Sequence, residues 1–416
     1  MRMEIKRKFV FALLAFCTAV SFRSDARTHP GVFISLANPA ITVQRRAVLA
    51  DAAKDGALLR LSGDGQLLVS GDGRGPVKLW DTRSGILIAE LKGTEGQSPR
   101  AFSPVNDRLL VSTHLKSLSL YDLRTMTLRS SVDLEKPLGS ASVFERFSPV
   151  GEFFLIDSAG KNKVTVWETK TARMLSSRAC SVPLFKSTFS PDSKTIISSC
   201  GDRKATLWDA RTGNVIAEFS HDEDVLLARF SADAKTVTTI TTSGQVMNWD
   251  AGTGRVKDSW ASQKSIFYAA FSPDGQVLGT VGWNGLATLW DVGSQQTKNS
   301  FRVSRKANHI NFSPDGKFVT ANGYAGEVSV WSVADGAAVL SITGHEKNIR
   351  YVNFSPDGRL VVSYSDDAVN VWDLALKAHV AKLSEAASMA VLSKDGKLLV
   401  TGGPKGSLIL WDINSQ

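Results

Sequence analysis

The residues of this chain that could carry out chemistry are few and widely spaced. The sequence has six histidines, three cysteines and one glycine-rich stretch at 71–75. Histidines and cysteines bind metals or activate nucleophiles only where several lie at defined spacings. The sequence contains no His-Glu-x-x-His, Cys-x-x-Cys, Gly-x-Ser-x-Gly or phosphate-binding Gly-Lys-Ser/Thr motif, and the Gly and Asp residues at 71–75 are ordinary turn formers. We therefore predict no catalytic residue, no metal site and no cofactor.

The composition indicates a globular chain without a nucleic-acid partner. The 416 residues are 43% hydrophobic and 21% charged, which excludes the disordered, collagen-like and coiled-coil classes. Lys and Arg outnumber Asp and Glu by 49 to 40, but the excess is spread along the chain with no basic block. Such a diffuse positive charge serves solubility and does not by itself predict binding to nucleic acid.

The first 26 residues have the features of a secretory signal peptide. Four basic residues lie within the first eight, an apolar run of twelve follows at 9–20, and the small residues Ser21 and Ala26 come next. The run is shorter than the roughly 20 residues that span a bilayer. We predict a signal peptide at 1–26, an N-terminal segment at 27–43, no transmembrane segment in the mature chain and a periplasmic or secreted location.

A tryptophan recurs along the chain at a nearly constant interval. It is preceded by Leu, Val or Asn, is followed in most copies by Asp, and returns every 39 to 46 residues, with Tyr121 in its place once. A serine, often within Phe-Ser-Pro, keeps the same interval, and Phe-Ser-Pro-Asp-Gly is intact at 271–275, 312–316 and 354–358. Together they define nine repeats, whose tryptophans are Trp80, Trp167, Trp208, Trp249, Trp290, Trp331, Trp372 and Trp411.

Each repeat is predicted to fold as four short β-strands. In the sixth repeat, strands at 266–271, 276–281, 286–290 and 298–303 alternate with turns. Pro presets φ and Gly accepts a positive φ, so Pro-Asp-Gly suits a tight turn. A four-stranded sheet cannot bury both of its faces alone, so the copies must stack on one another in a ring.

The repeat length, the Phe-Ser-Pro-Asp-Gly turn and the Trp-Asp ending resemble the WD40 family of β-propellers over residues 44–416. The resemblance implies an all-β fold of four-stranded blades, the last of which is completed by a strand from the other end of the chain. The ninth repeat stops at Gln416 without a fourth strand, so residues 45–50 are predicted to supply it. We predict a single propeller of nine blades; the alternative is eight blades plus a divergent end unit, because nine exceeds the usual four to eight.

WD40 blades carry a hydrogen-bonded tetrad of His, Ser or Thr, Asp and Trp, and the resemblance implies where it lies here. Most repeats have lost it, which the fold tolerates because a hydrogen bond contributes about 1 kcal/mol whereas truncating a buried Trp costs about 3–5. The tetrad residues are His221, Thr241 and Trp249 in the fifth repeat, with Ser243 in the Asp position, and His345, Ser365, Asp367 and Trp372 in the eighth.

The fourth repeat has cysteines at two of these positions. Cys180 takes the His position and Cys200 the Ser position, while Asp202 and Trp208 are retained. The two positions are hydrogen-bonded neighbours in the family, so the resemblance implies a Cys180–Cys200 disulfide, which suits an exported chain. Closing a loop of this length adds about 3 kcal/mol. The alternative is two free thiols that pack as small hydrophobes.

The resemblance places the partner-facing rim at the turn between the second and third strands and at the loop into the first. Trp283 lies at such a turn tip and is not one of the repeat's own tryptophans. Aromatic residues together with Arg on a rigid rim are typical of binding hot spots. The alternative for three of these residues, Phe185, Leu226 and Phe267, is packing under neighbouring loops. The predicted partner-binding residues are Trp283, Tyr324, Arg350, Phe267, Phe185 and Leu226.

These observations predict a non-catalytic protein–protein interaction scaffold outside the cytoplasm. It would be a monomeric propeller that binds a protein or peptide segment on its rim. The alternative is a propeller enzyme with a hydrolytic or cofactor site in the central channel, because the fold hosts enzymes when acidic or metal-binding residues line that channel. The sequence offers no spaced pair of carboxylates for that chemistry, so we predict no enzyme.

Overall fold

The structure of the protein is a computed structural model. It describes residues 41–50, 52, 58–103, 109–114, 117–133, 143–158, 162–180, 184–303, 307–323, 328–342, 345–347, 349–365, 367–383, 389–402 and 406–415. The predicted signal peptide at 1–26 lies outside the described residues. Within them, no helix has the length and hydropathy needed to cross a bilayer.

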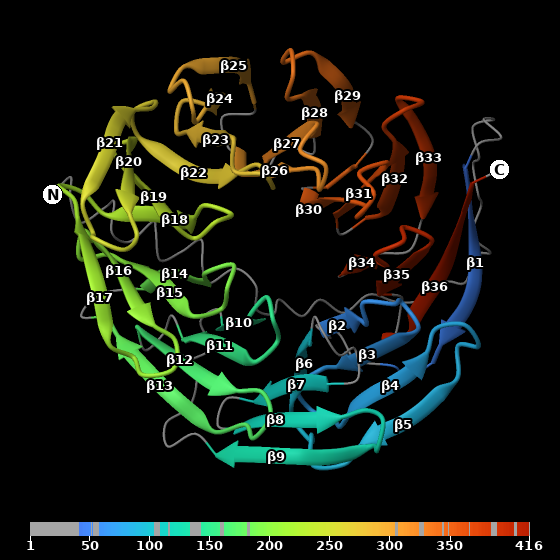
Figure 1. The fold of residues 1–416 in the computed structure, drawn as a ribbon. Coiled ribbons are helices and arrows are strands. Elements are labelled where there is room, and N and C mark those ends of the chain that lie inside the picture. Colours follow the sequence, from blue (N-terminus) through green and yellow to red (C-terminus); the bar gives the residue numbers. More distant parts are fainter. Residues whose placement is uncertain are drawn as a thin grey trace, which may run out of the picture.

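The described strands form nine antiparallel sheets of four strands each, arranged around a common centre (Figure 1). We number the sheets along the chain. Sheet 1 contains β2 (Leu58–Leu61), β3 (Leu67–Gly71), β4 (Val77–Asp81) and β5 (Leu87–Leu91); sheet 2 contains β6 (Ser98–Phe102), β7 (Leu109–His114), β8 (Ser117–Asp122) and β9 (Thr127–Asp133); sheet 3 contains β10 (Val143–Phe147), β11 (Phe153–Ser158), β12 (Lys163–Glu168) and β13 (Met174–Ala179).

The next three sheets follow the same order from the innermost strand to the outermost. Sheet 4 contains β14 (Leu184–Phe189), β15 (Thr195–Cys200), β16 (Lys204–Asp209) and β17 (Val215–Ser220); sheet 5 contains β18 (Val225–Phe230), β19 (Thr236–Thr241), β20 (Gln245–Asp250) and β21 (Val256–Ala261); sheet 6 contains β22 (Ile266–Phe271), β23 (Val277–Gly282), β24 (Leu286–Asp291) and β25 (Thr297–Arg302).

The last three sheets include the one that joins the two ends of the described chain. Sheet 7 contains β26 (Ala307–Phe312), β27 (Phe318–Gly323), β28 (Val328–Ser332) and β29 (Ala338–Ile342); sheet 8 contains β30 (Ile349–Phe354), β31 (Leu360–Ser365), β32 (Val369–Asp373) and β33 (Ala378–Leu383); sheet 9 contains β34 (Ala390–Leu392), β35 (Leu398–Gly402), β36 (Leu408–Ser415) and β1 (Ile41–Leu49).

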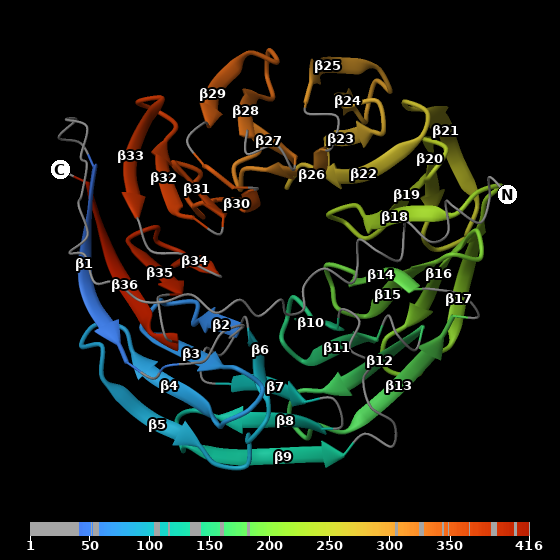
Figure 2. The same ribbon diagram turned by 180° about the vertical axis from the view of Figure 1, so that it is seen from behind.

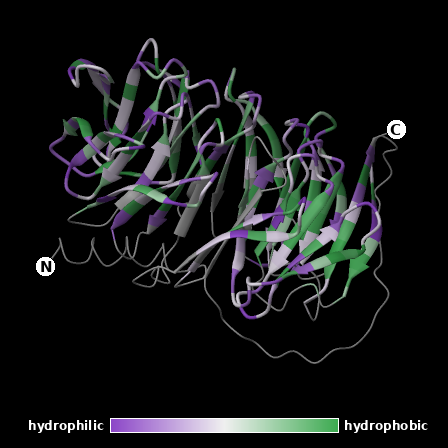
Figure 3. Cartoon of the chain, turned by 60° about the horizontal axis from the view of Figure 1, so that its bottom comes forward, coloured by the Kyte–Doolittle hydropathy of each residue, from purple (hydrophilic) through white to green (hydrophobic). Residues whose placement is uncertain are grey.

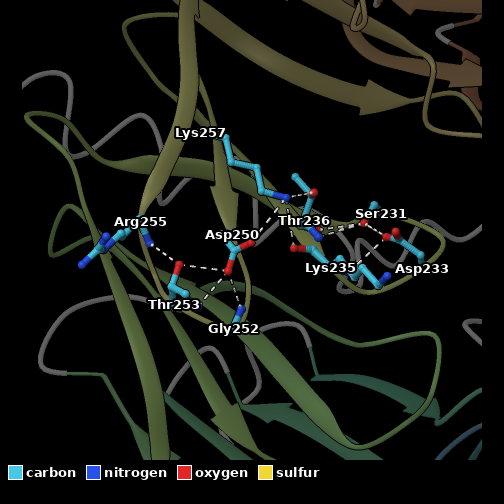
Figure 4. Close-up of polar contacts among 9 residues, drawn as sticks. All are labelled: Ser231, Asp233, Lys235, Thr236, Asp250, Gly252, Thr253, Arg255 and Lys257. Carbon is cyan, nitrogen blue, oxygen red and sulfur yellow. Dashed lines mark hydrogen bonds and ion pairs between the residues drawn. The ribbon is translucent and has the colours of Figure 1, made fainter.

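The turn between the first and second strands of a sheet is held by a serine and an aspartate, as sheet 5 shows (Figure 4). The Ser231 hydroxyl donates to Asp233 at 2.6 Å and accepts the Thr236 backbone N–H at 3.0 Å. This hydroxyl contact is the main cause that lowers the pKa of the Asp233 carboxyl. The same contact occurs in seven of the described turns: Ser62–Asp64, Ser190–Asp192, Ser231–Asp233, Ser272–Asp274, Ser313–Asp315, Ser355–Asp357 and Ser393–Asp395.

The core of the described chain lies between the sheets. It consists of nine clusters of buried apolar side chains, each built from two neighbouring sheets, and one of them joins sheet 9 to sheet 1. Figure 3 shows the matching pattern, with hydrophobic segments along the strands and hydrophilic ones concentrated in the turns. Burial of apolar surface contributes roughly 25 cal/mol per Å², so each sheet is stabilised mainly by its two neighbours.

The N-terminal strand completes the last sheet. β1 pairs antiparallel with β36, with Arg45 opposite Trp411, and lies beside it at the circumference (Figure 2). The strand begins at Ile41, four residues before the expected start at 45. The Arg46 side chain contacts the Asp412 carboxylate in sheet 9 and donates to the Thr82 carbonyl oxygen at 2.9 Å. Arg46 therefore links sheet 9 to the end of β4 in sheet 1.

Candidate functional site

Five consecutive first strands, in sheets 4 to 8, each contain a β-bulge near their start. In sheet 6, for example, Ile266 pairs with Gly282 and Tyr268 with Val281, which leaves Phe267 without a partner in the ladder. A bulge leaves the extra residue unpaired and redirects its side chain, and bulges are frequent beside functional sites. The unpaired residues are Phe185, Leu226, Phe267, Asn308 and Arg350.

The structure brings two of the predicted binding residues into contact. Trp283 lies in the turn between β23 and β24 and is 57% exposed. Its ring meets that of Phe267 edge-to-face, with centroids 4.5 Å apart and planes at 69°. The Trp283 backbone N–H donates to the Ser265 carbonyl oxygen at 3.3 Å, so the turn tip is tied to the residue just before β22. This aromatic pair, Phe267 and Trp283, forms a fixed apolar feature on the rim of sheet 6.

The structure does not place the other predicted binding residues in this aromatic pair. Leu226 is half-buried and packs against the cluster between sheets 5 and 6, which agrees with the packing alternative for that residue. Phe185 and Arg350 have described backbone positions at bulges, but their side chains lie outside what the structure describes. Tyr324 lies wholly outside the described residues.

The tetrad of sheet 5 contains a different hydroxyl from the predicted one. His221 Nε2 lies 2.7 Å from the Thr239 hydroxyl, and the Trp249 indole N–H donates to the same oxygen at 2.8 Å. Thr241 instead bonds to Ser243 at 2.9 Å, so its assignment to the tetrad was wrong. Successive residues of a strand point to opposite faces, so Thr239 and Thr241 lie on the same face of β19. Of these two, Thr239 is the one that meets the Trp249 indole.

The tetrad of sheet 8 contains the predicted residues and one more. His345 Nδ1 lies 2.7 Å from the Ser365 hydroxyl, which in turn donates to Asp367. His345 Nε2 lies 2.8 Å from the Ser363 hydroxyl, and this oxygen accepts the Trp372 indole N–H at 3.3 Å. Ser363 is therefore the residue that joins the histidine to the tryptophan, and the sequence interpretation omitted it.

A hydroxyl ten positions before the tryptophan, or nine in sheet 8, is the signal that would have identified these partners. In four further sheets the indole N–H donates to a hydroxyl at that spacing, at 2.9–3.0 Å. The spacing places the hydroxyl on the second strand beside the indole of the third. The pairs are Trp80 with Ser70, Trp208 with Ser198, Trp290 with Thr280, and Trp411 with Thr401.

The Cys180–Cys200 disulfide is confirmed, with the two Cα atoms 6.1 Å apart. Both cysteines border the core cluster between sheets 3 and 4. Asp202 was predicted to take the Asp position of the tetrad in this sheet, and the structure contradicts that role. Asp202 accepts the Lys204 backbone N–H at 3.2 Å in the exposed turn, while the Trp208 indole N–H donates to Ser198.

Stability should fall as the pH drops below about 6.5, because burial lowers the pKa values of His221, His345 and His379. Asp367 opposes this effect at His345, whereas Lys382 and His379 add to it. An unfolded histidine binds a proton near pH 6.5, so below that pH the unfolded state holds more protons than the folded state. The contribution is therefore present above pH 6.5 and lost on acidification. Urea unfolding measured between pH 5 and 7 at constant ionic strength tests this.

The His345→Gln variant is the matched control for the pH experiment. Gln263 precedes β22 in sheet 6 and accepts a hydrogen bond from Thr288 at 2.9 Å, so a glutamine is compatible with this part of a blade. The variant should show a shallower dependence of unfolding free energy on pH than the parent. Equal slopes would contradict a contribution from His345.

Among the described residues, no group of three or more His, Cys, Asp or Glu side chains lies close enough together to hold a metal ion. One small pocket lies between sheets 8 and 9, and its lining contains no acidic residue. The lining residues are Tyr351, Asn353, Val362, Tyr364, Ala390, Leu392 and Leu399.

Four-stranded sheets around a common centre, with an indole-to-hydroxyl contact repeated inside them, define a β-propeller repeat protein. A family model described as "WD domain, G-beta repeat" matches residues 179–209 and 336–373. These two segments match the WD40 repeat, and propellers built from that repeat generally serve as protein-interaction scaffolds and are typically non-catalytic.

A solved structure supports the fold. The crystal structure of the computationally designed Ika8 protein is similar, with a TM-score of 0.57 and 22% sequence identity over 75% of this chain and 94% of that chain. At this identity the similarity concerns the fold alone. No curated protein matches the chain.

Proposed function

We propose that this protein is a non-catalytic scaffold that binds a protein or peptide segment on the rim of sheets 4 to 8. The observation that carries the proposal is the aromatic pair of Phe267 and Trp283, at one end of a blade and half-open to solvent. An exposed indole costs free energy in water and has no role in the core here. Buried aromatic residues are the usual anchors of protein–protein interfaces.

The bulges supply the framework for such an interface. Each bulged residue is the second residue of an innermost strand, and the innermost strands of sheets 4 to 7 contact one another in succession. The unpaired residues therefore follow one another along the mouth of the channel on a rigid scaffold. A preorganised surface of this kind avoids much of the entropic cost of binding. A segment lying across the mouth would contact Phe267 and Trp283 and reach the neighbouring bulges.

We further propose that the nine sheets close into one ring that works outside the cytoplasm. The apolar cluster between sheets 9 and 1 supports the closure. The predicted signal peptide and the Cys180–Cys200 disulfide support the location, since disulfides persist mainly in oxidising compartments.

Replacing Trp283 and Tyr324 with alanine should weaken partner binding by at least tenfold, because truncating a hot-spot anchor commonly costs about 2 kcal/mol or more. Peptides selected from a randomised display library against the parent protein provide the ligand, and their affinities for parent and variant provide the measurement. Leu376→Ala is the matched control, because Leu376 is an exposed apolar residue near the opposite face. Equal affinities for the parent and the Trp283→Ala/Tyr324→Ala variant would exclude this rim as the site.

A further inference from the structure

The outermost strands of five consecutive sheets begin with exposed apolar side chains. These strands, β5, β9, β13, β17 and β21, follow one another along the outer circumference (Figure 1). In sheet 1 the exposed residues are three in succession, and Ile86 is 65% exposed. The apolar arc consists of Ile86, Leu87, Ile88, Met126, Leu128, Met174, Val215, Ile216 and Val256.

Each of these strands follows a turn that carries an exposed Arg or Lys. The five segments that contain the turns and strand starts, 81–88, 122–129, 168–175, 209–216 and 250–257, hold eight Lys or Arg residues and five Asp or Glu residues. The corresponding segments of sheets 6 and 7, 291–298 and 332–339, together hold one Lys or Arg residue and two Asp or Glu residues. All eight cations are exposed, and two of them, Arg129 and Lys257, lie 3.4 Å and 3.6 Å from the carboxylates of Asp122 and Asp250. The other six are Arg83, Arg124, Lys170, Arg173, Arg211 and Arg255.

The cations of one turn are directed in two ways, as sheet 5 shows (Figure 4). Lys257 donates to the Thr236 hydroxyl at 2.9 Å and lies 3.6 Å from the Asp250 carboxylate. The Asp250 carboxylate also accepts the Thr253 backbone N–H at 2.8 Å. The Arg255 side chain points away from this group (Figure 4). The aspartate is thus engaged by its own turn, while Arg255 is exposed to solvent.

The arc lies on the opposite face from the aromatic pair. Antiparallel order places the start of the first strand and the turn between the second and third strands at one end of each sheet. The turn into the outermost strand is then at the other end. Equivalent positions in successive sheets are related by rotation about the centre, so the five strand starts follow one edge of the molecule. A flat, extended partner can contact them together.

We propose that this arc, with its cations, docks the protein on the surface of a bilayer that contains anionic phospholipids. Basic side chains are drawn to acidic head groups, and aliphatic side chains beside them enter the boundary between head groups and acyl chains. The arc has no Trp, Tyr or Phe anchor and spreads over five sheets, whereas a protein hot spot is compact and rich in such anchors. The docked protein holds the aromatic pair away from the membrane.

Co-sedimentation of the full chain with vesicles tests the proposal. Binding is expected to vesicles of phosphatidylcholine with phosphatidylglycerol, to weaken as salt is added, and to be much weaker with phosphatidylcholine alone. The Arg124→Ser/Arg255→Ser variant should partition at least tenfold less, since each Lys or Arg near an anionic surface contributes about fivefold. The Lys298→Ser/Arg302→Ser control removes two exposed cations from β25, outside the arc, and should stay within about threefold of the parent.

A second variant, Ile86→Ser/Ile88→Ser, tests the apolar part of the arc without changing the charge. It should also bind the anionic vesicles more weakly, with an unchanged melting temperature as evidence of folding. The proposal is overturned if the parent shows no salt-sensitive binding, or if the control loses as much binding as the arc variant. The proposal is also overturned if the parent self-associates without vesicles and the Ile86→Ser/Ile88→Ser variant does not. The arc would then join two copies of the chain. None of these variants alters Phe267 or Trp283, so the result is independent of the rim site.

Discussion

Replacing Trp208 with alanine should lower the free energy of unfolding by about 3–5 kcal/mol. Trp208 is 0% exposed and belongs to the cluster between sheets 3 and 4, with Phe153 and Phe189. Its indole N–H also donates to the Ser198 hydroxyl at 3.0 Å. Alanine would leave a cavity between two blades that cannot collapse, because both are held by their own hydrogen bonds and by their other neighbours.

Urea unfolding followed by circular dichroism provides the measurement, with two controls. Ser198→Ala removes only the hydrogen-bond acceptor and should cost about 1 kcal/mol. Trp283→Ala removes the same side chain from an exposed turn and should change stability by less than about 0.5 kcal/mol. If Trp208→Ala cost no more than Ser198→Ala, packing of the Trp208 side chain would not be the main source of stability between sheets 3 and 4.

Leu49→Ala should lower the free energy of unfolding by about 2–5 kcal/mol, although it lies near the end of the N-terminal strand. Leu49 is 2% exposed and packs in the cluster that joins sheet 9 to sheet 1, with Leu59 and Trp80. Losing this contact weakens the junction between the two ends of the described chain, and every other sheet depends on it through its neighbours.

The adjacent residue provides the matched control. Val48 lies on the same strand but is 51% exposed, so Val48→Ala should change stability by less than about 0.5 kcal/mol. Thermal unfolding of both variants under identical conditions compares the buried and exposed faces of β1. Equal melting temperatures for the two would mean that the contact between sheets 9 and 1 does not stabilise the protein in solution.

Local patterns predicted the strands and turns closely. The first strand of the sixth repeat was expected at 266–271 and is Ile266–Phe271, while the second and fourth strands are each shifted by one residue. Hydrophobic alternation and Pro-Asp-Gly turns act between residues near in sequence, so spacing is enough to place them. The two cysteines were also paired correctly, because the family's blade makes those two positions neighbours.

Contacts between strands were harder to predict from spacing. Thr241 was chosen as the tetrad hydroxyl, yet Thr239 holds that place. Both residues lie on the same face of β19, and the register of β19 with β20 decides which of them meets the indole. The bulge at Phe267 is similarly invisible in the sequence, since it arises from a shift in pairing between two strands and leaves no mark in the repeat length.

Local patterns in the amino-acid sequence are sufficient to predict the repeat, its four strands and its turns, and the family resemblance adds the pairing of Cys180 with Cys200. Which side chains gather on each face of the assembled blades depends on the packing of the sheets. Phe267 meets Trp283 because a bulge turns it toward the adjacent turn, and the residues of the arc from Ile86 to Val256 follow one another because five sheets stand in succession. Periodicity encodes how each blade folds, whereas a surface depends on distances between residues of different blades, which no local pattern records.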